Sequence, residues 1–444
     1  MSFMERVKCA SGAFGDGAGP GIVVNDEIRF EEFKNELAKR LSPQQVAGLI
    51  ERNAVQARNE IRLACEDVIA ASPWLATGEL GGDALIEKYL DLVFGLGPLE
   101  PFVEDDSVTE VMVNGFNSVF YERDGVLYRS DSSFVNDEQV KALIDRILAP
   151  LGRRIDESSP MVNARLAQGH RVNAVIPPLA LDGPILTIRK FRTKVLSLDE
   201  MRSMGSFDES VQKLMAWSVL KRCNIAVTGG TGSGKTTLLN ALSCVIPHGE
   251  RIITIEDSAE LRFFEHPHVV RLEARPRNAE GFGEVTIRDL VINSLRMRPD
   301  RIVVGECRGA EALDMLQAMN TGHDGSLTTL HANSPKEAIA RLTTMVRYGA
   351  DLPVSVIEAQ IGSAMDVVVH TSRTPSGKRK VTQVGGLFLK SDGVCDIETY
   401  YEWDLVRSRG VWRGIPDWVD DLPFLGLAEA KEVDEWKKGL SLAA

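Results

Sequence analysis

The segment from Asn224 to Leu242, NIAVTGGTGSGKTTLLNAL, constrains the fold of this chain more than any other stretch. A short apolar run, Ile225 to Val227, has the character of a buried strand, and helical character follows from Thr237. Between them the sequence fits G-x-x-x-x-G-K-[ST], in which glycines let backbone N–H groups turn inward around a phosphate. The following helix directs its positive dipole end at the same anion. The segment therefore predicts a phosphate-binding loop between a strand and a helix.

The predicted loop and the first turn of its helix supply the nucleotide contacts. In such a loop Lys235 bridges the β- and γ-phosphates, and the Thr236 hydroxyl ligates Mg²⁺. An ordinary glycine-rich turn is the alternative, and the strand-loop-helix context disfavours it. The sequence thus predicts ATP and Mg²⁺ as cofactors, with the nucleotide held by Gly229, Gly230, Thr231, Gly232, Ser233, Gly234, Lys235, Thr236 and Thr237.

The remainder of the chain is predicted to form several regions around this loop. From Phe207 onward, short apolar runs alternate with helical stretches, which indicates a mostly parallel sheet covered by helices, with antiparallel strands after Met365. Residues 1–25 are glycine-rich and predict a flexible leader, and 26–82 have the period of a helical appendage. Residues 83–192 predict an α+β domain, 193–206 a linker, and 207–444 an α/β P-loop domain whose tail from 412 is a peripheral helix or docking element.

Composition limits the class of protein. No stretch approaches the roughly 20 apolar residues that cross a bilayer, and the first thirty lack a signal-like apolar core, so we expect a cytoplasmic protein. The six cysteines include no C-x-x-C pair, which argues against a disulfide framework and a four-cysteine zinc module. With 51 basic and 63 acidic residues, the formal charge of −12 provides no global positive field for nucleic acid.

Acidic residues follow two of the predicted strands. The run 252–255 delivers Glu256, Asp257 and then Glu260 to a strand end, where carboxylates would order the waters of Mg²⁺. N-caps or surface acids are the alternative. The segment RIVVGECR ends a second buried strand with Glu306, which would polarise the water that attacks the γ-phosphate. A salt-bridged structural glutamate is the alternative for Glu306.

Histidines and arginines complete the candidate site. His323 and His331 flank the next predicted strand, and as hydrogen-bond donors near the γ-phosphate they would report whether ATP or ADP is bound. Metal ligation is the rival explanation, and no third Cys or His stands at ligand spacing. A capping or core histidine is the alternative for His323. A guanidinium usually neutralises the transition state, and Arg171 and Arg189, on adjacent predicted strands, would close the first domain over the nucleotide. A solvated strand-edge arginine is the alternative for each, and the other candidates are Arg192, Arg275, Arg288 and Arg308.

Four ordered segments resemble the sequence boxes of a known family. GGTGSGKTT, IEDSAEL, RMRPDRIVVGECRGAEA and TGHDGSLTTLHANSP resemble, in order, the Walker A, Asp, Walker B and His boxes of the ATPases that power type II and type IV secretion and pilus assembly. GPLEPFVEDDSVTEVMVNGFNSVFYERDG and GHRVNAVIPP are similar to the tight-adherence (Flp) pilus branch, the CpaF or TadA assembly ATPases. The resemblance covers roughly residues 83–365.

This resemblance implies a RecA-like P-loop ATPase domain preceded by a smaller α+β domain. It implies a homohexamer with ATP between the two domains, in which hydrolysis rotates one domain against the other. Two departures stand out: the four-cysteine module common in type II secretion motors is missing, and the Walker B box ends in Gly-Glu where many P-loop enzymes place an aspartate. The resemblance assigns phosphate and Mg²⁺ contacts to Lys235 and Thr236, the Asp box to Glu260, the Walker B acid to Glu306, and the His box to His323 and His331.

The sequence therefore predicts a cytoplasmic hexameric ATPase that converts Mg·ATP hydrolysis into domain motion for pilus assembly or protein secretion. It would assemble with copies of itself and bind an inner-membrane platform protein. It would contact the membrane only through such partners. The alternative is a nucleic-acid motor for conjugation or packaging; the acidic balance and the lack of basic stretches interleaved with aromatic residues argue against nucleic-acid binding. A nucleotide-gated scaffold that does not hydrolyse ATP is a third hypothesis.

Overall fold

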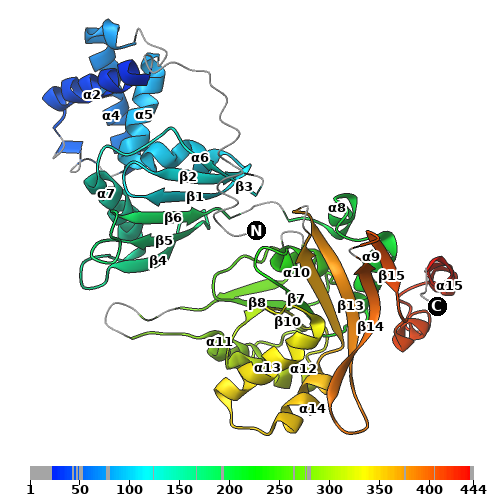
Figure 1. Ribbon diagram of the computed structural model, residues 1–444. Helices are drawn as coiled ribbons and strands as arrows, with labels where there is room; N and C mark the ends of the chain where they lie inside the picture. Colours follow the sequence, from blue (N-terminus) through cyan, green and yellow to red (C-terminus); the bar gives the residue numbers. More distant parts are fainter. Residues whose placement is uncertain are drawn as a thin grey trace. The chain divides into compact units, whose positions relative to one another are not determined.

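The chain forms two compact units, Met1–Phe191 and Arg192–Ala444. We call them the N-terminal and the C-terminal unit (Figure 1). The boundary lies one residue from the predicted end of the α+β domain. The predicted leader, residues 1–25, lies outside the described residues up to position 22, and its last three residues belong to the first helix described, contrary to the prediction. The computed structural model describes residues 23–42, 45, 46, 49, 54–76, 81–123, 125–166, 168–191, 195–263, 266–275, 277, 282–374, 377–404 and 406–440.

The N-terminal unit begins with a helical part that has its own core. Amphipathic helices bury one apolar stripe each, and here Phe33, Leu37, Ile61, Leu85 and Leu90 meet in one cluster. The last two belong to a helix that we expected in the α+β domain, so the helical appendage extends beyond residue 82. Its elements are α2 (Val23–Arg40), α4 (Ala54–Ala71), the 3₁₀ turn η1 (Pro73–Ala76) and α5 (Gly82–Phe94).

The rest of the N-terminal unit is a six-stranded antiparallel sheet covered by a helix, as the alternation of strands and helices predicts. The strand order is β3-β2-β1-β6-β5-β4. Val111 and Val113 alternate inward from one strand and pack with Val140, Ile144 and Leu148 of the helix. The elements are η2 (Gly97–Leu99), α6 (Glu100–Glu104), β1 (Val108–Asn114), β2 (Val119–Arg123), β3 (Val126–Arg129), α7 (Asp137–Leu148), η3 (Ala149–Leu151), β4 (Met161–Arg165), β5 (Arg171–Val175) and β6 (Ile185–Arg189).

The C-terminal unit is built on a nine-stranded sheet in the order β15-β14-β13-β12-β7-β11-β10-β8-β9. The strands from β12 to β9 are parallel, and β13, β14 and β15 continue the sheet antiparallel, as expected. The strands are β7 (Ile225–Gly229), β8 (Ile252–Glu256), β9 (Val269–Glu273), β10 (Arg301–Cys307), β11 (Leu327–Leu330), β12 (Val367–Arg373), β13 (Arg379–Leu389), β14 (Cys395–Asp404) and β15 (Arg409–Trp412). Because β7, β11, β10 and β8 run in one direction, their carboxyl ends share one edge.

Helices cover both faces of this sheet, which explains why its central strands are apolar throughout. In β7, Ile225 and Val227 enter one core while Ala226 enters the other. Helices α11 to α14 lie on one face and α9 and α10 on the other (Figure 1). The helices are α8 (Leu198–Ser203), α9 (Glu209–Leu220), α10 (Lys235–Ser243), α11 (Ile287–Ser294), α12 (Glu311–Asn320), α13 (Pro335–Gly349), α14 (Val354–Ala364), the 3₁₀ turn η4 (Asp417–Asp421) and α15 (Ala430–Gly439).

Two parts of the C-terminal unit differ from our expectations. The predicted linker contains α8, which begins at a capping box of Ser197 and Glu200 and buries two apolar side chains in the core. The tail is not peripheral either. Trp436 of α15 packs edge-on against Trp217 and Trp412, and its indole N–H donates to Ser210 O at 3.0 Å. Burial of these aromatic rings makes the tail part of the core.

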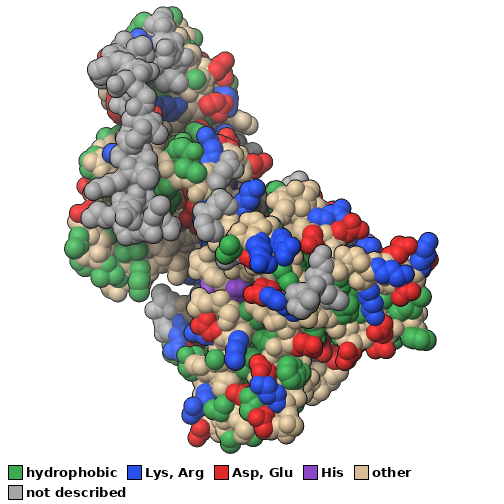
Figure 2. Space-filling view, turned by 45° about the vertical axis from the view of Figure 1, so that its right-hand side comes forward, with side chains coloured by type: hydrophobic (Ala, Val, Ile, Leu, Met, Phe, Trp, Pro, Cys, Tyr) green, Lys and Arg blue, Asp and Glu red, His purple; other side chains and the backbone are tan. Residues whose placement is uncertain are grey.

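Charge is intermixed on one face of the C-terminal unit. The face drawn in Figure 2 shows Lys and Arg side chains interspersed with Asp and Glu, without a large block of one sign. Among the described residues, no helix combines the length and the apolar character needed to cross a membrane.

Candidate functional site

The glycine-rich loop connects β7 to α10 and has the backbone conformation that only glycine adopts readily. Gly229, Gly232 and Gly234 have φ values of +152°, +69° and +99°. A Cβ on Gly229 would lie 2.3 Å from the carbonyl oxygen of Thr371. Both this steric clash and the positive φ therefore exclude a side chain at Gly229. Gly234 is the N-cap of α10, which therefore presents its first backbone N–H groups and positive dipole end at the loop.

Lys235 lies in the first turn of α10 and reaches back into the loop. Its side chain is almost fully buried, and Nζ donates to the carbonyl oxygens of Gly229 at 3.0 Å and Gly230 at 2.9 Å. Burial lowers the pKa of the ammonium; Glu306 raises it in opposition, and Arg308 lowers it further. A phosphate would therefore find a poorly hydrated cation held beside a helix N-terminus.

Glu306 lies at the carboxyl end of β10, where the strand departs from regular pairing. The register with β11 shifts between Val304 and Cys307, so Gly305 and Glu306 form a bulge, and the Gly305 carbonyl accepts from Thr329 Oγ1 at 2.7 Å. Bulges redirect side chains at strand ends. Glu306 Oε2 pairs with Arg308, and Oε1 has its close neighbour in His331.

His331 joins the lysine to the glutamate. It follows β11, the strand between β7 and β10, and its Nε2 lies 3.3 Å from Lys235 Nζ and 2.9 Å from Glu306 Oε1. Burial and then the Lys235 charge lower the pKa of the imidazole, while Glu306 raises it. These contacts bring Lys235, Glu306 and His331 together at the carboxyl ends of the strands.

Two acids of the Asp box, Asp257 and Glu260, interact electrostatically with Arg308. The pKa of Arg308 is raised first by its hydrogen bond to Glu306, and the negative charges of Asp257 and Glu260 raise it further. Asp257 is exposed and Glu260 half-buried. The site therefore combines carboxylates with a cluster of cations at the carboxyl ends of β8, β10 and β11.

Glu256 differs from the expectation that it faces the nucleotide. Its side chain is 3 % exposed, Oε2 accepts the backbone N–H of Glu260 at 2.6 Å and of Leu261 at 2.8 Å, and Oε1 finds no hydrogen-bond partner among the described residues. Its Cγ lies so close to Gly305 that a Cβ there would be 2.7 Å away. Burial raises its pKa to about 7, against the effect of the two backbone hydrogen bonds. Glu256 therefore holds the Asp-box loop against β10.

The oxygen donors present suit Mg²⁺. Thr236 lies half-buried in the first turn of α10, next to Lys235. Within the described part of the chain, no group of three or more His, Cys, Asp or Glu side chains could hold a metal ion. Mg²⁺ normally keeps several waters and takes one or two protein oxygens together with substrate phosphates. A hydroxyl in the first turn after a phosphate loop fits that mode, and the Mg²⁺ roles of Thr236 and Asp257 stay predictions.

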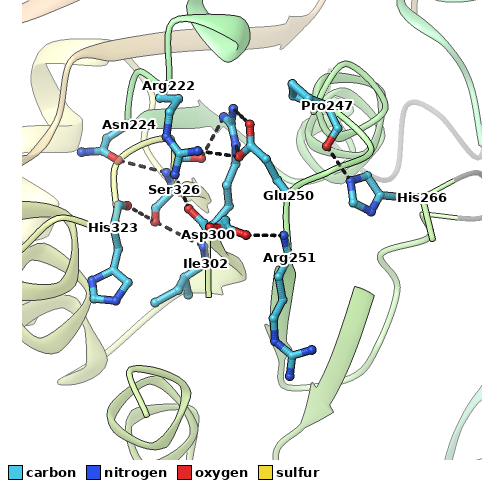
Figure 3. A network of polar contacts seen from close by, with 12 residues as sticks. Arg222, Asn224, Pro247, Glu250, Arg251, His266, Asp300, Ile302, His323 and Ser326 are labelled. Atoms are coloured by element: carbon cyan, nitrogen blue, oxygen red, sulfur yellow. Dashed lines mark hydrogen bonds and ion pairs between the residues drawn. The ribbon is translucent and has the colours of Figure 1, made fainter. Parts of the chain in front are cut away.

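His323 lies before the amino end of β11, and Figure 3 shows its contact with Ser326. It precedes β11, whereas His331 follows it, so the strand separates the two histidines. The ring Nδ1 lies 3.2 Å from Ala318 O at the end of α12, and the His323 carbonyl accepts from Ser326 Oγ at 2.7 Å. The expectation that both histidines contact the γ-phosphate is therefore corrected for His323, whose contacts close the α12–β11 turn.

Sequence reasoning missed three side chains beside the phosphate loop, all from β12 and β13. His370 Nδ1 lies 2.9 Å from Thr228 Oγ1, Thr371 Oγ1 lies 2.9 Å from Ser233 Oγ, and Arg379 Nε donates to Gly232 O at 3.0 Å. Some 140 residues separate these partners along the chain. Only the pairing of β12 with β7 brings them together, and no local motif indicates that pairing.

Arg171 and Arg189 lie in the N-terminal unit on adjacent strands, as predicted. They are direct partners across β5 and β6, and Arg189 is also opposite Glu110 of β1, with Nε 3.5 Å from a carboxylate oxygen. Arg165 of β4 extends the row next to Arg171. Directly opposed residues of an antiparallel pair share one face, so three arginines line up across this sheet. Their role at a nucleotide stays a prediction.

Known proteins resemble this chain over most of its length. A family model described as "Type II/IV secretion system protein" matches residues 94–398. A putative conjugal transfer protein of Mycobacterium tuberculosis is 40% identical over 299 residues, which are 66% of this chain and 84% of that protein. The type IV secretion system protein VirB11 of Brucella suis is 35% identical over 315 residues, or 65% of this chain and 87% of that protein.

Two solved structures are also similar to this chain. The VirB11 ATPase of the Brucella suis type IV secretion system, in complex with sulphate, is 32% identical and covers 66% of this chain and 97% of its own, with a TM-score of 0.35. The pilus retraction motor PilT with bound ADP is 17% identical and covers 78% and 89%, with a TM-score of 0.48. On the sequence match of the family model and of these relatives, the chain belongs to the type II/IV secretion system ATPase family.

Proposed function

We propose that this protein hydrolyses Mg·ATP at the loop between β7 and α10 and uses the energy to drive pilus assembly or protein secretion. The observation that carries the proposal is the convergence of a buried lysine and a strand-end glutamate. His331 Nε2 lies within 3.3 Å of Lys235 Nζ and 2.9 Å of Glu306 Oε1. A cation that grips phosphate and a carboxylate that orients water are the two parts that phosphoryl transfer to water requires.

Each side chain then has a role that its position supports. The loop backbone and Lys235 hold the β- and γ-phosphates, and Glu306 orients and polarises the attacking water. His331, beside both, donates toward the γ-phosphate. Thr236 would hold Mg²⁺, with Asp257 and Glu260 ordering its waters, and the ion would neutralise charge on the phosphates.

Two substitutions test the hydrolytic assignment. Lys235→Ala should abolish nucleotide binding measured by titration calorimetry, because the principal phosphate cation is gone. Glu306→Gln should retain ADP and ATP binding within about threefold and lose turnover by about 10²-fold or more, since a removed general base is worth typically that much. Glu402→Gln on β14, an exposed glutamate, is the matched control. Turnover of Glu306→Gln equal to that of the control would discard the base assignment.

The transition-state cation is proposed to come from the N-terminal unit, in the same or a neighbouring subunit. The row of Arg165, Arg171 and Arg189 supports this source. A fragment of residues 195–444, which keeps α8, should then bind ATP and hydrolyse it poorly. A guanidinium of this kind contributes about 10³ to 10⁵ in rate, so robust hydrolysis by the fragment would rule the idea out.

The working assembly is proposed to be a cytoplasmic homohexamer that docks on an inner-membrane platform protein of a tight-adherence pilus or secretion machine. Membership of the secretion family and the CpaF/TadA-like segments of the sequence support this proposal. Analytical ultracentrifugation of the full chain with Mg²⁺ and a non-hydrolysable ATP analogue should give a mass six times that of the 48.8 kDa protomer. A sedimenting species that stays monomeric under all nucleotide conditions would contradict the ring.

A nucleic-acid motor is the second candidate, and one observation favours it. The relative from Mycobacterium tuberculosis carries the name of a putative conjugal transfer protein. The intermixed surface charge in Figure 2 and the acidic total argue for protein partners instead. Stimulation of the ATPase by single- or double-stranded DNA, with a steep loss of the effect between 50 and 200 mM salt, would support the second candidate.

A further inference from the structure

The strands β12 and β13 contact the phosphate loop at positions that the nucleotide chemistry described above does not use. Thr371, the fifth residue of β12, is buried, and its hydroxyl lies 2.9 Å from Ser233 Oγ and 3.1 Å from Thr228 O. Thr228 and Ser233 stand on either side of the loop. One threonine therefore ties the start of the loop to its far side.

Arg379, the first residue of β13, contacts the tip of the same loop. Its Nε donates to Gly232 O at 3.0 Å, and its Cδ lies where a Cβ on Gly234 would be only 3.3 Å away. The guanidinium thus bonds one loop residue while its stem packs against another. Arg379 itself is exposed, so neither contact fills a core.

The carbonyl that Arg379 binds fixes the direction of an N–H group. The Gly232 carbonyl and the Ser233 N–H belong to one trans peptide plane, in which they point in opposite directions. With its carbonyl bonded to the guanidinium, this peptide points its Ser233 N–H the opposite way, and that N–H donates to Gly230 O at 3.4 Å. Arg379 therefore fixes a peptide whose N–H group closes the loop on itself.

We propose that Arg379 and Thr371 are positioning residues that hold the phosphate loop in its anion-binding conformation, so that β12 and β13 set the affinity for the nucleotide diphosphate moiety. This inference rests on the proposed function. Because the loop is exposed at Gly230, Thr231 and Gly232, a loop without these two contacts samples other backbone conformations. It must then be ordered when the nucleotide binds, which weakens binding without touching the water or the general base.

Arg379→Met tests the proposal, with Arg373→Met as the matched control. Arg373 ends β12, is also exposed, and donates its Nε to Gly377 O at 3.3 Å within the hairpin, away from the loop glycines. Titration calorimetry with Mg·ADP should give a Kd about five- to tenfold weaker for Arg379→Met, as the loss of one ordinary hydrogen bond at an exposed site predicts. KM for ATP should rise by the same factor, kcat should stay within twofold, and the melting temperature without nucleotide should not change. Arg373→Met should match the unaltered protein.

Three results would overturn the proposal. The first is a Kd for Arg379→Met within twofold of the control, and the second is a fall in kcat with unchanged Kd, which would make Arg379 part of the chemistry. The third is a normal ADP affinity for a folded Thr371→Val protein, which keeps the shape of Thr371 without its hydroxyl. Failure of the unaltered protein to bind ADP would instead refute the proposed function, and this inference with it. Normal ADP binding with no effect of Arg379→Met would refute the inference alone.

Discussion

The buried carboxyl of Glu256 predicts a specific dependence of stability on pH. Its pKa is raised from 4.5 to about 7 because burial disfavours the charged form. The folded protein therefore binds this proton more tightly than the unfolded chain does. Below pH 4.5 the carboxyl is protonated in both the folded and the unfolded state, so it does not affect the free energy of unfolding. As the pH rises from 4.5 to about 7, the folded state loses stability progressively.

The magnitude follows from the size of the shift. Two and a half pKa units correspond to about 3 kcal/mol of destabilisation at high pH, of which about 2 kcal/mol develops between pH 5.5 and pH 8.5. Glu256→Gln removes the titration, and the amide oxygen can still accept the N–H groups of Glu260 and Leu261. Any cost of burying the amide is the same at every pH. The free energy of unfolding of the variant, relative to the unaltered protein, should therefore rise by about 2 kcal/mol over this range.

Urea unfolding followed by tryptophan fluorescence measures this difference. Five of the six tryptophans lie in the C-terminal unit, so the signal reports mainly on the unit that contains Glu256. Asp257→Asn is the control, because that neighbouring carboxyl is exposed. The difference in the free energy of unfolding between Glu256→Gln and the unaltered protein could instead stay constant from pH 5.5 to 8.5. That result would refute the argument that the charge of Glu256 destabilises the folded protein.

Three further predictions concern stability. Gly305→Ala places a Cβ 2.7 Å from Glu256 Cγ and should cost about 1–3 kcal/mol in urea unfolding, a loss that Glu256→Ala should relieve in the double variant. Trp436→Ala should lower the free energy of unfolding by about 3–5 kcal/mol because it leaves a cavity in the aromatic cluster around α15. Phe424→Ala is the control, because that residue is 92% exposed, and it should cost under about 1 kcal/mol. Equal losses would place α15 outside the core. Arg301→Met leaves the Glu250 carboxylate without its buried partner and should lower the free energy of unfolding in urea by about 3–5 kcal/mol. An unchanged free energy of unfolding would mean that Arg222 alone satisfies Glu250.

The parts of this structure that local sequence determines could be predicted. The loop between β7 and α10 depends on glycines with positive φ and on the residues directly beside them. Glu306 could be placed because an apolar strand inside an α/β pattern must deliver its last side chain to the edge where ligands bind. In each case the cause and its effect lie within a few residues of one another.

The remainder depends on how strands pair and on which way side chains turn. Glu256 and Asp257 are adjacent in sequence, yet Glu256 is the last residue of β8 and is buried, whereas Asp257 follows the strand and is exposed. The contacts of Thr371 and Arg379 depend on the insertion of β12 beside β7. A local signal was present only for α8, where Ser197 and Glu200 have the spacing of a capping box.

The location of His331 between two opposite charges makes it a two-position element. Its Nε2 lies 3.3 Å from Lys235 Nζ, from which an unprotonated nitrogen accepts, whereas Glu306 Oε1, 2.9 Å away, has no hydrogen-bond partner among the described residues. Burial lowers the pKa of the imidazole, which favours its neutral form. A hydrogen on Nε2 would instead face the Glu306 carboxylate, so the protonation of this one nitrogen decides which of its two neighbours His331 serves.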